Sequence, residues 1–165
     1  MKKALVIGGA NGIGLAMALL LAKEYEQVTI IDKVGSNMEM PNNVVIEIAN
    51  LLNGDLSFLA NHHDIDTLII TAGFGRVTRF ENITEVEISN CFQVNSVAVT
   101  KILHHYYPRM QQTENFYCAV MGSIAGLVSS PLFSLYAATK AAICRLTESL
   151  NIELEKSGTD NRILN

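Results

Sequence analysis

Tyr136 and Lys140 stand four residues apart in the run SLYAATKAAICRLTESL, and Ser123 lies thirteen residues before the tyrosine. Residues at i and i+4 of a helix share a face, so a phenol and an ammonium would project together into one cleft. An unperturbed tyrosine titrates near pH 10, too high for a general base at neutrality. A lysine charge about 5 Å away, at an effective dielectric of about 20, stabilises a phenolate by roughly 3 kcal/mol. The spacing therefore predicts a proton-transfer site. The alternative is an amphipathic helix with a half-buried tyrosine and a solvated lysine.

The elements that must position these residues alternate along the chain. The patterns predict strands at 3–8, 27–32, 44–48, 66–71 and 116–121, and helices at 12–25, 54–62, 84–112 and 132–156. The first helix is expected to bury Ile13, Ala16, Leu19, Leu20 and Ala22. Pro108 is expected to bend or end the helix over 84–112. Continuous apolar strands separated by helices predict an α/β fold with a doubly wound parallel sheet, a Rossmann-like domain over 1–165.

Composition narrows the class of protein. The chain has 49% hydrophobic and 17% charged residues and a net charge of −4, which argues against disorder and against nucleic-acid binding. Its apolar runs are too short for a membrane span, and no signal peptide precedes the first strand, so we expect a cytoplasmic protein. Cys91, Cys118 and Cys144 are expected to be buried thiols. The histidine pairs 62–63 and 104–105 lack ligand spacing with a carboxylate and are expected to have surface or helix-face roles, so no metal site is predicted.

A glycine-rich segment, Gly8-Gly9-Ala10-Asn11-Gly12-Ile13-Gly14, connects the first strand to the first helix. Gly8 would allow a sharp turn, Gly12 a close approach of backbone amides to a pyrophosphate, and Gly14 close packing of helix on sheet. The alternative is a hairpin turn at Asn11-Gly12, which the helical spacing that follows disfavours. Asp32 ends the second strand, where a carboxylate can accept hydrogen bonds from ribose hydroxyls and would repel a 2′-phosphate. This favours NAD over NADP, although Lys33 follows at once.

Taken together, these motifs resemble the short-chain dehydrogenase/reductase family. The segment 8–14, Asp32, the turn 71–73, Asn95, Ser123 and the Tyr136/Lys140 pair occur in that family's order and approximate spacing. The resemblance implies four catalytic roles. Tyr136 would exchange a proton with the substrate oxygen, and Lys140 would stabilise its phenolate and bind the nicotinamide ribose. Ser123 would hydrogen-bond the substrate oxygen, and Asn95 would hold a water that connects Lys140 to solvent.

The resemblance also implies a set of cofactor contacts. They are Gly8, Asn11, Gly12, Ile13, Gly14, Asp32, Lys33, Asn50, Leu51, Ala72, Gly73, Tyr136 and Lys140. Asn50 departs from the aspartate usual in the family. Ile70 and Thr71 stand where two asparagines are common, which would weaken local hydrogen bonding.

The predicted function is hydride transfer between NAD(H) and a secondary alcohol or ketone. The family continues beyond the point where this chain stops, so the fifth strand is expected to be an exposed edge. An NAD(H)-binding module without turnover is therefore the alternative. A third hypothesis is an interaction protein that uses the helices 84–112 and 132–156 as a dimer face, and a homodimer or homotetramer through these helices is expected. The substrate is not specified by the sequence, although Arg76 and Arg79 could favour an anionic or polar one.

Overall fold

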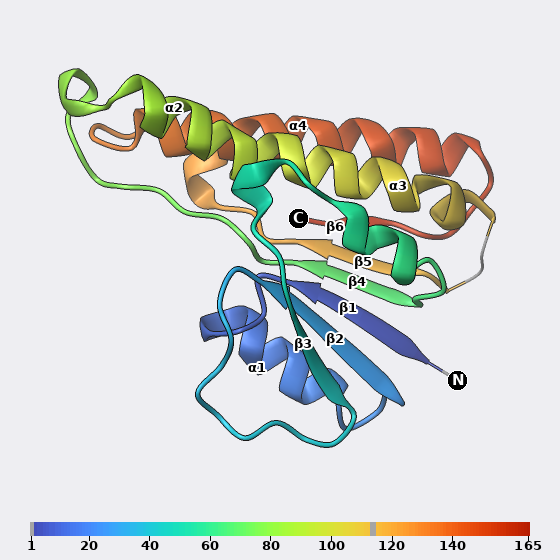
Figure 1. Cartoon of the computed structure of the whole chain (residues 1–165). Coiled ribbons are helices and arrows are strands. Elements are labelled where there is room, and N and C mark those ends of the chain that lie inside the picture. Colours follow the sequence, from blue (N-terminus) through green and yellow to red (C-terminus); the bar gives the residue numbers. More distant parts are fainter. Residues whose placement is uncertain (1, 113–114) are drawn as a thin grey trace.

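A computed structural model describes residues 2–112 and 115–165, and a parallel sheet forms the middle layer of the fold (Figure 1). Six strands are found in the described residues, in the spatial order β3-β2-β1-β4-β5-β6. They are β1 (Lys3–Ile7), β2 (Gln27–Asp32), β3 (Val44–Ile48), β4 (Thr67–Ile70), β5 (Tyr117–Val120) and β6 (Ile163–Leu164). Each adjacent pair is parallel. This order confirms the predicted doubly wound α/β fold, whose strand order reverses between β1 and β4.

Helices cover both faces of this sheet. Helix α1 (Gly12–Leu21) lies on one face, and α2 (Glu85–Phe92), α3 (Val99–Gln112) and α4 (Ser134–Lys156) lie on the other (Figure 1). Between α2 and α3 the chain continues as a π-helix, Gln93–Ala98, so the predicted long helix 84–112 is continuous but changes its winding. Short 3-10 turns complete the list of helical segments: Leu51–Asn53, Ser57–Asn61, Phe80–Asn82 and Ile124–Gly126.

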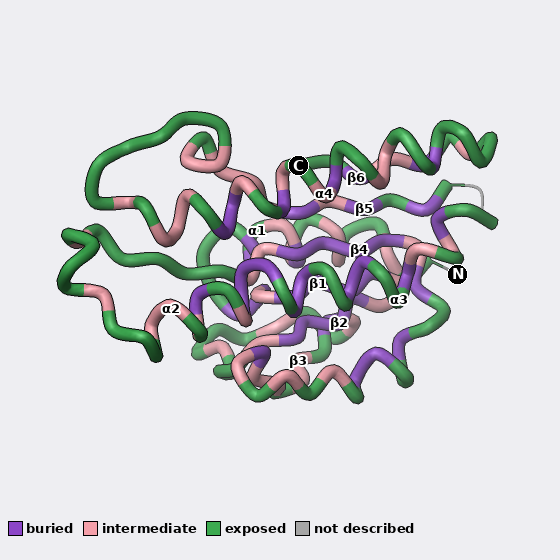
Figure 2. The backbone as a smooth tube through the Cα atoms, turned by 90° about the horizontal axis from the view of Figure 1, so that it is seen from above, coloured by how far each residue is buried: buried purple, intermediate pink, exposed green. Residues whose placement is uncertain are grey.

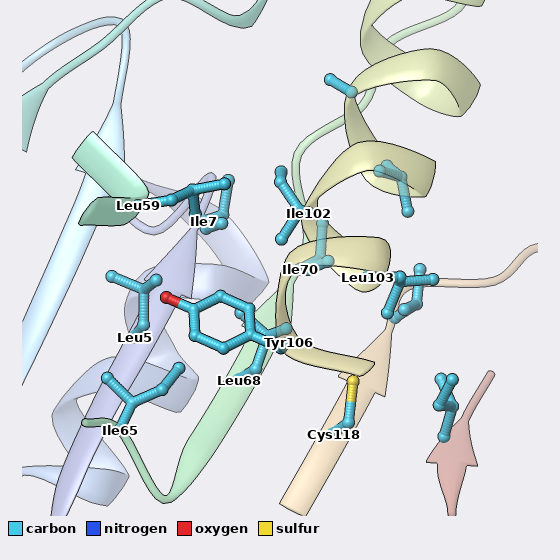
Figure 3. Packing of buried hydrophobic residues seen from close by; sticks show 14 of the residues in the cluster. Leu5, Ile7, Leu59, Ile65, Leu68, Ile70, Ile102, Leu103, Tyr106 and Cys118 are labelled. Carbon is cyan, nitrogen blue, oxygen red and sulfur yellow. The ribbon is translucent and has the colours of Figure 1, made fainter. Parts of the chain in front are cut away.

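The larger of the two hydrophobic clusters lies between the sheet and α3 (Figure 3). Its most voluminous member is Tyr106, whose ring is 1% exposed and stacks near Phe116. The Tyr106 hydroxyl donates to the carbonyl oxygen of His62 at 2.8 Å. Burial holds the pKa of Tyr106 well above its ordinary value. A single phenol thus joins α3 to the turn that leads into β4.

The face that α1 buries agrees only in part with the predicted one: Leu19 and Ala22 are partly buried and pack against the smaller cluster, but the other three residues do not face the core. Leu15 and Ala18 are buried, whereas Ile13 and Leu20 are more than half exposed. Ala16 is exposed as well. Nearly every position of this helix is apolar, so the sequence offered no contrast from which to read the buried side. In Figure 2 the buried residues follow the central strands and the inner sides of the helices.

Four further details correct the sequence-based expectations. A short sixth strand pairs with β5 at Cys118 and Ala119, so that edge is partly covered. The predicted helix at 54–62 is a 3-10 turn. Helix α3 continues past Pro108 to Gln112, so the proline does not end it. His62 is 9% exposed and its ring contacts Glu47, so it is not a surface residue. Cys91 and Cys118 are buried as expected, and Cys144 is partly buried.

No helix in the described part of the chain is both long and apolar enough to cross a membrane.

We expect Tyr106→Phe to lower the free energy of unfolding by about 1–3 kcal/mol, because it leaves the buried His62 carbonyl without its donor. Urea denaturation measures this difference. Tyr117→Phe is the matched control, since Tyr117 is 57% exposed and should lose almost nothing. Equal losses in the two variants would show that the Tyr106–His62 bond does not contribute as described.

Candidate functional site

A cleft of about 200 Å³ opens where the carboxyl ends of β1, β2 and β4 meet. This is the position at which open α/β sheets bind ligands, because the connections leave to opposite faces there. Of the predicted cofactor contacts, the cleft is lined by Gly8, Asn11, Asp32, Lys33, Asn50, Leu51, Ala72 and Gly73. Gly12, Ile13 and Gly14 follow Asn11 directly and form the first turn of α1. Eight of the thirteen predicted contacts thus line one opening, and three more adjoin it, whereas Tyr136 and Lys140 are not among the lining residues.

The glycine-rich segment is held to the end of β4 by a close approach of backbones. Gly8 has φ +86°, and a Cβ there would collide with the backbone of Ala72. A Cβ on Gly14 would collide with the carbonyl oxygen of Gly8 and the hydroxyl of Thr71. The Thr71 hydroxyl donates to the Gly8 carbonyl oxygen at 2.9 Å. Thr71 was expected to weaken this region, but its hydroxyl forms the bond that joins the two segments.

Asp32 connects the end of β2 to the same segment. Its Oδ2 accepts from the backbone N–H of Ala10 at 3.0 Å. Asn11 precedes α1 in an extended conformation, and its side chain makes no capping hydrogen bond. The first N–H groups of a helix have no partner within the helix, so the start of α1 offers donors and a positive dipole end beside the cleft.

Asn50 lines the cleft while also capping the 3-10 turn that follows β3. Its Oδ1 accepts from the backbone N–H of Leu52 at 3.1 Å. The neighbouring Leu51 is buried, and its carbonyl oxygen accepts from Gln93 of the π-helix. The turn is therefore tied to the π-helix, whose Val94 also lines the cleft.

Asn95 lies in the π-helix and is 1% exposed. Its Oδ1 accepts from the backbone N–H of Phe74 at 2.9 Å, and its Nδ2 donates to the Phe74 carbonyl oxygen at 2.7 Å. Nδ2 also donates to Thr139 Oγ1 at 3.1 Å. These contacts use both Nδ2 hydrogens of the carboxamide. The side chain thus fixes the loop after β4 to α4, and the water predicted at Asn95 stays a prediction.

Lys140 is only 6% exposed, so the alternative of a solvated lysine is wrong. Its Nζ donates to the carbonyl oxygen of Met121 at 2.7 Å and lies 5.8 Å from the centroid of the Tyr136 ring. Burial lowers the pKa of Lys140, and the nearby Cys91 acts in the opposite direction. A Cβ on Gly73 would stand 3.5 Å from this Nζ. Gly73 lines the cleft, so the ammonium lies close to one of the cleft's lining residues.

Tyr136 is half-buried, and its ring meets Phe133 edge-on with the centroids 6.2 Å apart. Ser123 lies at the start of the 3-10 turn after β5, where its Oγ accepts from the backbone N–H of Ala125. That bond leaves the hydroxyl hydrogen available for a ligand. The turn itself packs on α4, because a Cβ on Gly126 would stand 2.8 Å from the Lys140 carbonyl carbon. The turn that carries Ser123 is thereby seated on the helix that carries Tyr136 and Lys140.

The sequence comparisons agree with this geometry. The family profile described as short chain dehydrogenase matches residues 56–161, which is more than half of the chain. This chain belongs to the short chain dehydrogenase family. Among its relatives, the 3-oxoacyl-acyl-carrier-protein reductase FabG of Rickettsia prowazekii is 27% identical over 175 residues, an alignment that covers 95% of this chain and 68% of the relative.

Solved structures share the fold of this short chain dehydrogenase. A short chain dehydrogenase/reductase family protein superposes with a TM-score of 0.86 at 26% identity, over 96% of this chain and 70% of the other. Two structures below 25% identity show the fold alone. 4-Hydroxyisoleucine dehydrogenase, complexed with NADH and succinate, has a TM-score of 0.79 at 22% identity, over 94% of this chain and 75% of its own. An ElxO variant with NADPH bound has a TM-score of 0.80 at 20% identity. The superposition covers 96% of this chain and 70% of the ElxO chain.

Three residues position the site of this short chain dehydrogenase: Thr71, whose structural role sequence reasoning misjudged, and Thr139 and Gly75, which it did not single out. Thr71 joins the glycine-rich segment to β4. Thr139, which is fully buried, donates to the Tyr136 carbonyl oxygen and accepts from Asn95. Gly75 lies directly against the Tyr136 ring. Thr139 stands immediately before Lys140, and that adjacency was the one available signal. The contacts of Thr71 and Gly75 join residues more than sixty positions apart.

We expect the contribution of Lys140 to stability to rise with pH. Burial lowers its pKa from the ordinary value of 10.5, so between the two pKa values the unfolded chain binds more protons than the folded one. In that window, stability increases with pH. The difference in free energy of unfolding between wild type and Lys140→Met should therefore grow in favour of wild type as the pH rises from the lowered folded-state pKa toward the ordinary value of 10.5.

Urea denaturation at several pH values measures this trend. Lys101→Met, at an exposed position of α3, is the matched control and should show a flat difference. A flat difference for Lys140→Met as well would mean that its ammonium is hydrated in the folded protein.

Proposed function

We propose that this protein transfers a hydride between NAD(H) and a secondary alcohol or ketone. The observation that carries the proposal is the buried ammonium of Lys140, which lies 5.8 Å from the centroid of the Tyr136 ring and close to Gly73, a residue that lines the cleft. A buried ammonium is unfavourable unless it has a partner or a task. Perturbed titratable groups in clefts are candidates for catalytic sites.

The residues of the cleft fit a dinucleotide. Gly12 has φ +55°, and a Cβ there would meet nothing within 4 Å, so the backbone at the start of α1 is open to a pyrophosphate. Asp32 would hold the adenosine ribose, and its charge would disfavour a 2′-phosphate. Asn50 and Leu51 would border the adenine, and Ala72 and Gly73 the nicotinamide half. When bound, the nicotinamide supplies or accepts the hydride.

The protein's own residues would handle the proton and the substrate oxygen. Tyr136 would donate its phenolic proton to a ketone oxygen, or accept one from an alcohol. The Lys140 ammonium would stabilise the phenolate that remains and hold the ribose. Ser123 would donate its free hydroxyl hydrogen to the substrate oxygen, where charge develops. Asn95 would keep Lys140 in place by fixing α4 to the loop after β4, and a water held near it would connect the lysine to solvent.

The arginines of the loop after β4 do not favour an anionic substrate. Arg76 forms an ion pair with Glu87 at 2.8 Å and donates to the carbonyl oxygen of Asn82. Arg79 lies 3.6 Å from Glu81. Their charges are thus balanced locally, which supports a neutral ketone or alcohol as substrate.

Two measurements separate the proposal from its alternative. Fluorescence titration with NADH reports binding, and absorbance of the reduced cofactor reports turnover with secondary alcohols, ketones and 3-oxoacyl thioesters. Turnover supports the oxidoreductase. Binding without turnover of any of these substrates favours the NAD(H)-binding module, and the absence of binding contradicts both.

We expect Tyr136→Phe to lower kcat by about 100-fold or more, because general acid–base catalysis contributes about 10²–10⁴-fold. The dissociation constant for NADH should change little, since the variant keeps the ring. Tyr25→Phe is the control: its hydroxyl pairs with Thr67 at the amino end of the sheet, and its kcat should match wild type. Full activity in Tyr136→Phe would refute the acid/base role.

We expect Asp32→Asn to weaken NADH binding by about 10-fold, as the loss of a charge-assisted hydrogen bond does. NADPH binding should stay level or improve, because the repulsion of a 2′-phosphate is gone. The asparagine can still accept from Ala10, so the loop should keep its place. Glu39→Gln removes one negative charge from the exposed loop after β2 and serves as the control. An unchanged ratio of NADH to NADPH affinity in Asp32→Asn would contradict the assignment of Asp32.

A further inference from the structure

Gly75 packs against the ring of Tyr136 more closely than any other residue type could. A Cβ added at Gly75 would stand 2.5 Å from Tyr136 Cδ2, 2.7 Å from Cγ and 2.9 Å from Cβ. The backbone at Gly75 does not have a positive φ, so its conformation alone would tolerate another residue. Glycine is therefore needed here for space, and the space is occupied by the phenol ring.

The backbone that presses on the ring is itself fixed. The residue before Gly75 is Phe74, whose N–H and C=O are both hydrogen-bonded to the Asn95 carboxamide. Three residues after Gly75, the N–H of Thr78 donates to the carbonyl oxygen of Leu132 at 3.0 Å. Leu132 has φ +67°, an unusual conformation for a leucine, and lies just before α4. The loop is thus anchored on both sides of Gly75.

The Asn95 carboxamide also holds the backbone of Tyr136, through Thr139. Asn95 Nδ2 donates to Thr139 Oγ1, and Thr139 Oγ1 donates to the backbone carbonyl oxygen of Tyr136 at 2.7 Å. Asn95 is thus connected to Tyr136 by two routes. One runs through Phe74 and Gly75 to the phenol ring, and the other runs through Thr139 to the backbone of Tyr136. The positions of the ring and of the backbone of Tyr136 therefore both depend on the buried Asn95 carboxamide.

We propose that Gly75 is a positioning residue for Tyr136, with its backbone forming one wall of the slot that fixes the phenol ring. The inference rests on the proposed function only for its effect on turnover. The packing of Gly75 against the Tyr136 ring can be tested whether or not the protein is an active enzyme. A methyl group at Gly75 would force the ring or the loop to move, and misplacement by about 1 Å can reduce a rate by about 100-fold.

A double-mutant cycle tests the slot without any need for turnover. Gly75→Ala should lower the urea midpoint of the wild-type chain by about 0.5 M or more, as overpacking does. In a Tyr136→Ala background the same change should cost clearly less, because Cδ2 and Cγ, the two atoms that the methyl group meets most closely, are gone and only Cβ remains. If Gly75→Ala alone does not fold, recovery of folding in the double variant still supports the proposal. Equal losses in both backgrounds, or failure of both to fold, would overturn it.

Nuclear magnetic resonance of ring-labelled tyrosine gives an independent readout. The chain has five tyrosines, and Tyr136→Phe identifies the signal of Tyr136 by its disappearance. Gly75→Ala should shift this signal and leave the other four in place. Gly35→Ala is the matched control, since a Cβ at Gly35 meets nothing within 4 Å. An unmoved Tyr136 signal in folded Gly75→Ala would overturn the proposal.

Turnover then separates this inference from the proposed function. In an active enzyme, Gly75→Ala should lower kcat by about 10-fold or more while the dissociation constant for NADH and the KM of the substrate stay within about twofold. Gly35→Ala should keep the wild-type kcat. If wild type shows no turnover, the proposed function fails, and the cycle and the ring signal still decide whether Gly75 positions Tyr136. A wild-type kcat in Gly75→Ala would overturn the inference in an active enzyme.

Discussion

The buried carboxamide of Asn95 is the contact on which the arrangement of the site depends. It joins the loop after β4 to α4, two segments far apart in the sequence, through hydrogen bonds to Phe74 and Thr139. A buried amide that lost one of these partners would be strongly unfavourable, so the two segments are held together rather than merely adjacent. The π-helix that carries Asn95 is consistent with this role, because such turns change the direction in which side chains leave a helix and often occur at functional sites.

A second set of contacts connects the cleft to Asn95. Both this set and the Asn95 hydrogen bonds involve the residues that directly follow β4. Thr71 binds the Gly8 carbonyl oxygen, and two residues later Gly73 lies next to Asn95 and Lys140. The glycine-rich segment and the catalytic candidates are therefore positioned from one short stretch of backbone. A displacement of this stretch would move the cleft and the candidate catalytic residues together, so their relative geometry would be kept.

The sequence predicted the strands well because buried parallel strands read as uninterrupted apolar runs: β2 and β3 have the predicted bounds. It predicted the buried face of α1 poorly because an almost wholly apolar helix has no periodic contrast. The Tyr136–Lys140 pair was accessible because helical spacing alone brings i and i+4 together. The contact between Gly75 and Tyr136 could not be predicted. The two residues are 61 positions apart, and no periodic pattern in the sequence connects them.

The buried stripe of α4 argues that this helix is not arranged for stability alone. It includes Thr139, Lys140 and Thr147 where apolar residues would pack without desolvating polar groups. The Lys140 ammonium donates to a neutral carbonyl oxygen and forms no ion pair within residues 2–112 and 115–165. A methionine at this position would avoid the desolvation of a charge, so packing does not explain the lysine. What a methionine could not provide is a positive charge 5.8 Å from the centroid of the Tyr136 ring, and that charge is what the proposed acid/base role of Tyr136 would use.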